Sequence, residues 1–313
     1  MDVKKGEILG FVGPNGAGKS TTMKMLAQTI TPTSGEIWVQ INDSLQQVNK
    51  ARIDLLVTQL GFLLEVPEFY PDLTPRQHLT YFAKLGAFPA RQVRTRVEEV
   101  VDMVGMSEWI DKKIKTFSKG MRQKIGIAAA LVHDPEIVVL DEPQTGLDPG
   151  ARLEIHDLLL KLKADGKTIF LSSHLLYEVS ELCDRVAIIN HGMLVAVDSI
   201  ENLEAKIKHS RILVKLLHHR GSGEIEKILM ECRTLIGSLR NLEDPNEQNV
   251  QYNPSTNELE IEFNGSPQEQ YNIIKILVEC GIEFSEFKAS KVTALEEIYL
   301  KLIQTDDKLI ETT

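Results

Sequence analysis

The sequence predicts an α/β protein with an inserted block of helices, followed by a smaller α+β domain. Three observations support this prediction. Nearly continuous apolar runs alternate with helical patterns, which is typical of a largely parallel sheet covered on both faces. Residues 72–133 contain one helical pattern after another and no good strand. Beyond residue 208, shorter strands and helices alternate again.

The first elements are a strand, a loop and a helix. EILGFV is an apolar run bounded by glycines and predicts a buried strand, which a loop joins to a helix from about Lys19 to Gln28. GEIWVQI predicts a second strand, residues 42–58 are ambiguous, and LGFLLE is extended again. This order is the beginning of a βαβ arrangement.

The helical block has a clear start signal. Thr74 is a suitable N-cap, Pro75 occupies the first helical position, and Gln77 stands three residues after the cap. The helical patterns VRTRVEEVVDMV and MRQKIGIAAALV continue the block. We therefore expect a helical subdomain at about residues 72–133, inserted into the α/β core.

The core then resumes with three buried strands, EIVVLDE, KTIFLSS and RVAIIN, separated by two helical patterns. MLVAVD adds a last strand, and SIENLEAKIK closes this unit, which gives a first domain over residues 1–208. A second, α+β domain is predicted over residues 209–305, with a polar loop at residues 241–257 and a polar tail at residues 306–313.

Composition restricts the class of partner. The 313 residues carry a formal net charge of −10, which does not favour nucleic acid as a partner. No apolar run reaches the roughly 20 residues that a membrane-spanning helix needs, and we find no export signal. We therefore expect a cytoplasmic protein that does not itself span a membrane.

The loop after the first strand matches the phosphate-loop pattern G-x-x-x-x-G-K-[ST]. Its glycines let the backbone present N–H groups to phosphate oxygens, and the following helix adds its dipole. The cation of Lys19 suits the β- and γ-phosphates, and the hydroxyl of Ser20 can ligate Mg2+. The predicted nucleotide-binding residues are Gly13, Pro14, Asn15, Gly16, Ala17, Gly18, Lys19, Ser20 and Thr21.

Two acids end the strand IVVLDE, at the sheet edge where open α/β sheets place their ligands. Asp141 is the candidate metal-side carboxylate, and Glu142 is the candidate base that accepts a proton from water. Two acids at a strand end are a weak signal by themselves, because strand ends are commonly polar. The phosphate loop upstream strengthens it.

GPNGAGKST, FSKGMRQ, IVVLDEP, TGLDP and the lone histidine of LSSH occur in this order, and together they resemble the ATP-binding cassette (ABC) transporter ATPases, most closely those of drug exporters. The resemblance covers residues 1–208, and a small α+β extension is known in that branch. It implies that Ser118 and Gly120 contact the ATP held by a second subunit, although Ser118 is also a suitable plain N-cap. It further implies that His174 contacts the γ-phosphate and orients Glu142.

The sequence departs from the family at two positions. The family places a glutamine near the metal where this chain has Glu65, which keeps an oxygen ligand and adds negative charge beside Mg2+. Lys119 replaces a glycine that is typical of the family signature. A third departure is the early phosphate loop, since the family has about two strands and an adenine-stacking aromatic residue upstream. We expect those strands to be missing here, with a misassigned start codon as the simplest explanation.

The leading hypothesis is therefore an ATPase subunit of an exporter, which pairs as a homodimer or heterodimer around two ATP molecules and Mg2+ and drives a membrane permease. Such a subunit would lie on the cytoplasmic face of the membrane through that permease. The alternative is a nucleotide-binding regulatory protein with little turnover, because the adenine-binding segment would be absent. A GTPase is disfavoured because NKAR, at Asn49, lacks the acid of a base-reading N-K-x-D motif.

Overall fold

The structure, a computed structural model, describes residues 1–41, 44–48, 58–64, 69–206, 210–218, 222–239, 250–263, 266–290 and 299. The chain forms two compact units, Met1–Ile200 and Glu201–Lys301, which are described separately below. The structure places the boundary after Ile200, whereas the sequence predicted it near residue 208. Helix α8 (Ile200–Lys206) occupies most of the interval between residues 200 and 208.

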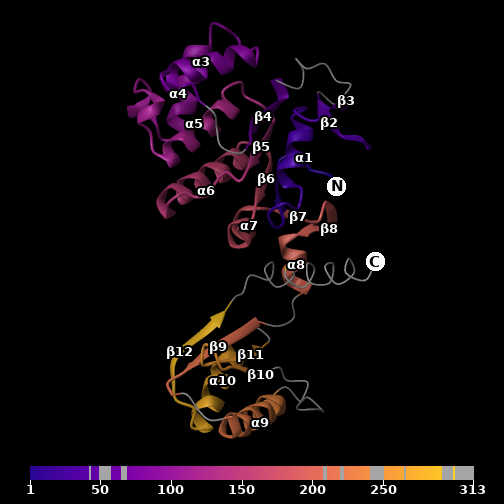
Figure 1. Ribbon diagram of the computed structural model, residues 1–313, viewed down its shortest axis with the longest axis vertical. Helices are drawn as coiled ribbons and strands as arrows, with labels where there is room; N and C mark the ends of the chain where they lie inside the picture. Colours follow the sequence, from indigo (N-terminus) through magenta and orange to yellow (C-terminus); the bar gives the residue numbers. More distant parts are fainter. Residues whose placement is uncertain are drawn as a thin grey trace. The chain divides into compact units, whose positions relative to one another are not determined.

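The first unit is built on a six-stranded sheet of order β4-β5-β6-β1-β7-β8 (Figure 1). All neighbours are parallel except β7 and β8, which are antiparallel. The strands are β1 (Ile8–Val12), β4 (Leu60–Leu63), β5 (Ile137–Asp141), β6 (Thr168–Ser173), β7 (Arg185–Asn190) and β8 (Met193–Ser199). The predicted α/β core with a mainly parallel sheet is confirmed.

Helices cover both faces of this sheet, which explains why its strands are apolar without alternation. On β1, Leu9 and Phe11 pack in one cluster with Met23 of α1 (Lys19–Leu26). Gly10 faces the other way, where a Cβ atom would lie 2.7 Å from the side chain of Val179 on α7 (Leu176–Leu182). Helix α6 (Pro149–Ala164) lies on the same side as α7, opposite α1 (Figure 1).

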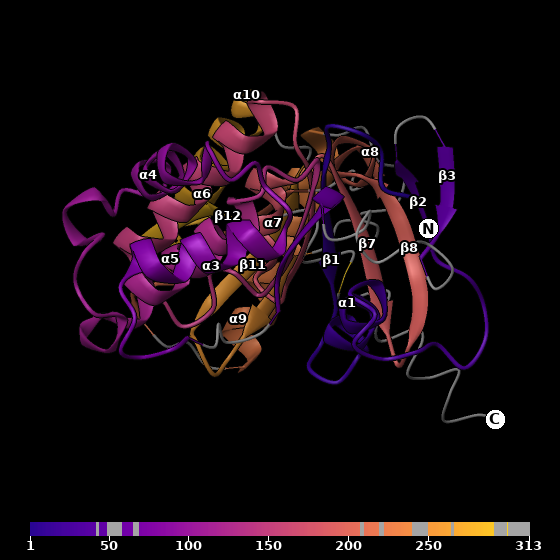
Figure 2. The ribbon, with the colours of Figure 1, turned by 90° about the horizontal axis from the view of Figure 1, so that it is seen from above.

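The helical block contains α3 (Pro75–Leu85), α4 (Val93–Met103) and α5 (Lys119–Leu131), with two short 3-10 turns, η1 (Ser107–Trp109) and η2 (Ile114–Thr116). The predicted capping box starts α3, because the Thr74 side chain accepts from Gln77 while the Gln77 side chain accepts from Thr74. Figure 2 shows these helices gathered apart from the hairpin of β2 (Trp38–Ile41) and β3 (Ser44–Gln47).

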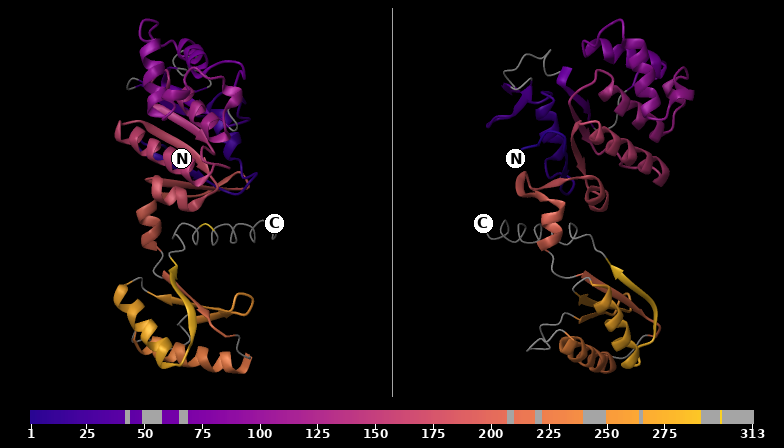
Figure 3. Two further views of the ribbon diagram at one scale, coloured as in Figure 1. Left: turned by 90° about the vertical axis from the view of Figure 1, so that its left-hand side faces the viewer. Right: turned by 180° about the vertical axis from the view of Figure 1, so that it is seen from behind.

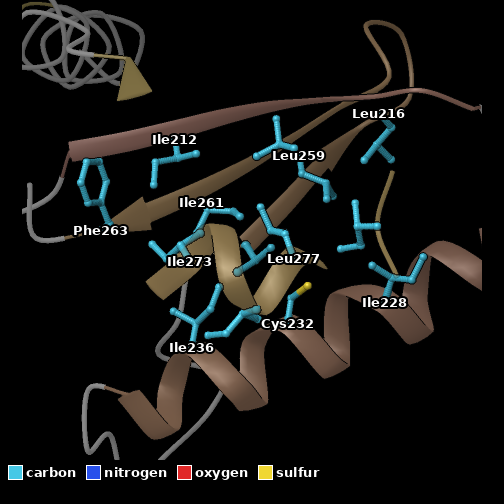
Figure 4. Close-up of a cluster of buried hydrophobic side chains, with 14 of the residues drawn as sticks. Ile212, Leu216, Ile228, Cys232, Ile236, Leu259, Ile261, Phe263, Ile273 and Leu277 are labelled. Carbon is cyan, nitrogen blue, oxygen red and sulfur yellow. The ribbon is translucent and has the colours of Figure 1, made fainter. Parts of the chain in front are cut away.

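The second unit has the element order β-α-β-β-α-β (Figure 3), with a fully antiparallel sheet of order β10-β11-β9-β12, as in ferredoxin-like folds. Its elements are β9 (Ser210–Leu216), α9 (Ser222–Leu239), β10 (Val250–Asn253), β11 (Glu258–Phe263), α10 (Pro267–Glu279) and β12 (Phe284–Ser290). Apolar side chains from strands and helices meet between them (Figure 4).

The sequence prediction for this unit was wrong at β10, which forms within the stretch expected to be a polar loop. Val250 is fully buried and Tyr252 packs against the core, whereas Gln251 and Asn253 face outward. A four-residue edge strand with two polar positions gives a weak alternation signal. The helix expected from TALEEIYLKLI falls, apart from Tyr299, outside the described residues.

No helix in the described part of the chain combines the length and the apolar character that crossing a bilayer requires.

Candidate active site

The phosphate loop joins β1 to α1 and is shaped by its glycines. Gly16 and Gly18 have φ angles of +81° and +109°, in the region that favours glycine. At Gly13 a Cβ atom would lie 2.3 Å from the carbonyl oxygen of Ile189, so no larger residue fits. Gly18 is also the N-cap of α1, where no side chain caps the helix. The backbone N–H groups of the first turn are therefore available for an anion.

Lys19 lies inside this loop. Its side chain is 6% exposed, and its ammonium group donates hydrogen bonds to the carbonyl oxygens of Gly13 at 2.8 Å and Pro14 at 3.2 Å. The same nitrogen lies 3.6 Å from Oε1 of Glu142. A cation is thus held between the loop and the candidate base.

Asp141 ends β5, and its side chain is almost fully buried. One carboxylate oxygen, Oδ1, accepts a hydrogen bond from the hydroxyl of Ser172. The other oxygen, Oδ2, is buried and has no hydrogen-bond partner among the described residues. A buried carboxylate oxygen left without a donor, in a cleft that the Ser20 side chain also lines, fits a divalent cation.

Glu142 follows with a φ angle of +50°, which is uncommon for a residue other than glycine. Its backbone N–H donates to the hydroxyl of Ser172 at 2.9 Å. Its Oε2 accepts a hydrogen bond from the Thr145 hydroxyl at 2.7 Å and lies 2.7 Å from Nδ1 of His174. The candidate base is therefore fixed at its backbone and at its carboxylate.

Sequence reasoning missed Ser172 and Thr145. Ser172 stands two residues before His174, and Thr145 three residues after Glu142, so both belong to segments that had been singled out for other residues. The available signal was a hydroxyl residue within three positions of a residue that was already a candidate. What the sequence could not supply is that Ser172 pairs in register with Asp141 on the neighbouring strand.

These groups face one cleft of about 490 Å³ at the carboxyl ends of β1, β5 and β6. Its lining residues come from the phosphate loop, the two acids and the segments after them, namely Asn15, Gly16, Gly18, Lys19, Ser20, Thr21, Asp141, Glu142, Thr145 and His174. The predicted residues Gly13, Pro14 and Ala17 form the same loop without lining the cleft. Glu65 lies outside the described residues.

Ser118 and Gly120 do not line this cleft in the described part of the chain. Ser118 is the N-cap of α5, and its side chain accepts a hydrogen bond from the Met121 N–H at 3.2 Å. Gly120 packs closely on α6, since a Cβ atom there would lie 3.2 Å from that of Ala151. The structure thus brings Glu142, His174 and Lys19 together and leaves the signature residues elsewhere on the surface.

The fold and the loop define a P-loop nucleotide-binding protein with an inserted helical block. A family model described as ABC transporter matches residues 1–145. The uncharacterized ABC transporter ATP-binding protein YcbN of Bacillus subtilis (strain 168) is 33% identical over 304 residues, which are 97% of this chain and 90% of the relative. The chain belongs to the family of ABC transporter ATP-binding proteins.

Other relatives match over a shorter stretch. The uncharacterized ABC transporter ATP-binding protein all4389 of Nostoc sp. (strain PCC 7120 / SAG 25.82 / UTEX 2576) is 41% identical over 65% of this chain, and the match spans only 59% of the relative. The bacitracin transport ATP-binding protein BcrA of Bacillus licheniformis is 40% identical over 66% of this chain and 65% of the relative.

A solved structure agrees with the fold. It is described as a dimeric structure of a post-hydrolysis state of the ATP-binding cassette MJ0796 bound to ADP and Pi. Its sequence is 26% identical, its TM-score is 0.57, and the match covers 64% of this chain and 88% of the other. Proteins of this family bind ATP, generally with Mg2+.

Proposed function

We propose that this chain binds ATP with Mg2+ in the described cleft, hydrolyses it to ADP and phosphate, and works as the ATPase subunit of an ABC exporter. The carboxylate of Glu142 carries the proposal. It faces the phosphate loop, and hydrogen bonds to Thr145 and His174 hold it there. A carboxylate in this position can accept the proton of a water molecule directed at a bound γ-phosphate.

In the proposed reaction, water attacks the γ-phosphate and ADP is the leaving group. The oxygen of a water molecule bonds to the γ-phosphorus, and one of the water protons passes to Glu142. The bond from the γ-phosphorus to its bridging oxygen breaks, and this oxygen leaves with ADP. Lys19 faces the negative charge that spreads over the phosphate oxygens in the transition state, at a site fixed before the reaction. His174 keeps the Glu142 carboxylate in place.

Ser20 and Asp141 are the residues that would hold Mg2+, whose chemistry is to neutralise phosphate charge and align the leaving group. The unpartnered Oδ2 of Asp141 supports this assignment. Glu65 remains part of the proposal on the family resemblance alone, because it lies outside the described residues.

We further propose that two subunits share each site. Ser118 and Gly120 stand at the start of α5, outside the cleft of their own chain, which leaves them available to contact the ATP of a second subunit. Backbone N–H groups at a helix start suit an anion. The solved relative described as dimeric with ADP and Pi supports this arrangement for the present chain.

The membrane partner would be a permease, with the chain on the cytoplasmic face. The name of the relative BcrA, a bacitracin transport ATP-binding protein, favours a drug-export role. A contact surface is available at the start of the helical block, where Tyr70, Tyr81 and Leu85 expose large apolar areas. Aromatic side chains are enriched in protein interfaces. Co-purification of the chain with its permease would support the assignment, and its absence from membranes that contain the permease would count against it.

ATP hydrolysis and ATP binding should be measured on the wild type and on Glu142→Gln. The amide cannot accept a proton, so we expect turnover to fall by about 100-fold or more while ATP binding persists. Glu136→Gln is the matched control. Glu136 is exposed and stands just before the first residue of β5, at the end of the strand opposite Asp141 and Glu142. Equal turnover of the wild type and Glu142→Gln would instead support the regulatory alternative.

A further inference from the structure

A polar network that lies outside the cleft joins α6 to α7. The Nη1 group of Arg152 donates to the Tyr177 hydroxyl at 2.8 Å and to Oε1 of Glu178 at 3.4 Å. The Tyr177 hydroxyl in turn donates to the same Oε1 at 2.9 Å. The three groups therefore form a closed triangle between two helices that pack against each other (Figure 1).

This network is buried at its centre. The Glu178 side chain is only 7% exposed, and that of Arg152 is 31% exposed. Burial, followed by the neighbouring Glu178 carboxylate, raises the pKa of Tyr177, so its hydroxyl keeps the proton that it donates. Nε of Arg152 and Oε2 of Glu178 are buried and have no hydrogen-bond partner among the described residues. A part-buried ion pair that leaves two buried atoms without partners contributes little to stability by itself.

The position of the network relates it to the cleft. Glu178 lies four residues after His174, on helix α7, which begins two residues after His174. Arg152 lies in the first turns of α6, just after the N-cap Asp148. The side chain of Gln144, two residues after Glu142, donates to the Arg152 carbonyl at 3.2 Å. Arg152 thus contacts both the segment that follows Glu142 and the helix that follows His174.

The same turns of α6 also contact the signature helix. Ala151 packs on Gly120 of α5, and Glu154 forms an ion pair with Lys124 of α5. The first turns of α6 therefore lie between the signature residues and the helix after His174.

We propose that Arg152 and Glu178 are positioning residues for His174: their ion pair fixes the start of α7 and so holds His174 against the Glu142 carboxylate. This inference rests on the proposed function, because the reaction it serves is the proton transfer to Glu142. The His174 side chain is 41% exposed, and its Nδ1 lies 2.7 Å from Oε2 of Glu142, so its orientation toward that carboxylate depends on the segments that carry the two residues. Small displacements of such a group are costly for turnover.

The first test is Glu178→Gln in the full-length chain, which keeps the volume and an acceptor for Tyr177 but removes the charge. We expect kcat for ATP to fall by about tenfold to 100-fold, with the KM for ATP within about twofold of the wild type. The ring nitrogen signals of His174, followed by NMR on histidine-labelled protein, should shift in the same variant. The ring signals report the position of His174 without requiring turnover.

Glu7→Gln is the matched control. Glu7 is 9% exposed and pairs with Arg185 at 3.0 Å, in an ion pair of similar burial at the amino ends of β1 and β7. Because the phosphate loop lies at the other end of β1, we expect Glu7→Gln to lower the melting temperature and to leave kcat and the His174 signals unchanged. Equal effects of the two variants on kcat and on the His174 signals would overturn the proposal.

A second variant covers the case in which Glu178→Gln does not fold. Tyr177 is 43% exposed, so Tyr177→Phe should fold, and loss of the bridging hydroxyl should lower kcat by about threefold or more. Wild-type kcat and unmoved His174 signals in Tyr177→Phe would refute the positioning role. If the wild type turns over no faster than Glu142→Gln, the proposed function fails, and the His174 signals alone then decide whether the ion pair positions this residue.

Discussion

Replacing Ser172 by alanine removes one hydroxyl that serves both acids of the cleft. This hydroxyl donates to Oδ1 of Asp141 and accepts from the backbone N–H of Glu142 at 2.9 Å. Ser172 is fully buried, so water cannot replace either bond. The substitution therefore removes the hydrogen-bond partner of a buried carboxylate oxygen and of a part-buried N–H group at the same time.

The expected loss of stability can be calculated from these two hydrogen bonds. A hydrogen bond to a charged group contributes about 2 kcal/mol and a neutral one about 1 kcal/mol, which gives a loss of about 3 kcal/mol in the free energy of unfolding. For a unit of this size, each kcal/mol lowers the melting temperature by about 2–4 °C, so we expect a drop of about 6–12 °C. Turnover should also fall, by about tenfold or more, because Glu142 loses its backbone anchor.

Thermal unfolding followed by circular dichroism and ATP turnover should be measured together. Thr168→Val is the control, because Thr168 lies at the other end of β6, is also buried, and the substitution removes a single neutral hydrogen bond from the Gly6 N–H. We expect that control to lose about 1 kcal/mol and to keep wild-type turnover. If Ser172→Ala melts within about 2 °C of the control and turns over normally, the reasoning about the shared hydroxyl is refuted.

Three further predictions concern other parts of the first unit. Gly13→Ala should abolish the rise in melting temperature that ATP gives the wild type, because a Cβ atom there would lie 2.3 Å from the Ile189 carbonyl oxygen; a normal rise would contradict this. Burial lowers the pKa of His78 to about 4, so the unfolded chain binds the proton more tightly and stability falls as the pH drops below about 6.5. Urea unfolding should show a loss of about 2 kcal/mol between about pH 7.5 and pH 5 that His78→Phe removes, and an unchanged loss in that variant would argue against His78. Thr74→Ala should cost about 1 kcal/mol through the lost cap of α3, and an equal urea midpoint would show that the cap contributes nothing.

Much of the fold could be predicted because its signals are local. The run before Gly13, the glycines of the loop and the cap at Thr74 each specify structure within a few residues. The strand β10 was missed because its pairing with β11, not its own sequence, makes Val250 a core residue. The ferredoxin-like strand order of the second unit likewise depends on contacts between distant segments.

The candidate site also contains residues that can be predicted from local motifs and residues that cannot. Lys19, Asp141 and Glu142 stand in motifs whose chemistry is readable from residue types and spacing. Ser172 contacts Glu142 from the neighbouring strand, and Thr145 contacts it within a local turn. The positive φ angle of Glu142 has no signal in a single sequence. The ion pair between Arg152 of α6 and Glu178 of α7 could not be predicted, because it depends on how these two helices pack.

If Glu142 accepts the water proton in a site that a second subunit completes, turnover depends both on this carboxylate and on dimer formation. Phosphate release per chain should be measured against chain concentration for the wild type and for Glu142→Gln, with saturating ATP and Mg2+. We expect turnover per wild-type chain to rise with concentration as dimers form, and Glu142→Gln to stay at background throughout. Turnover per chain that is independent of concentration, or equal in the two proteins, would contradict this expectation.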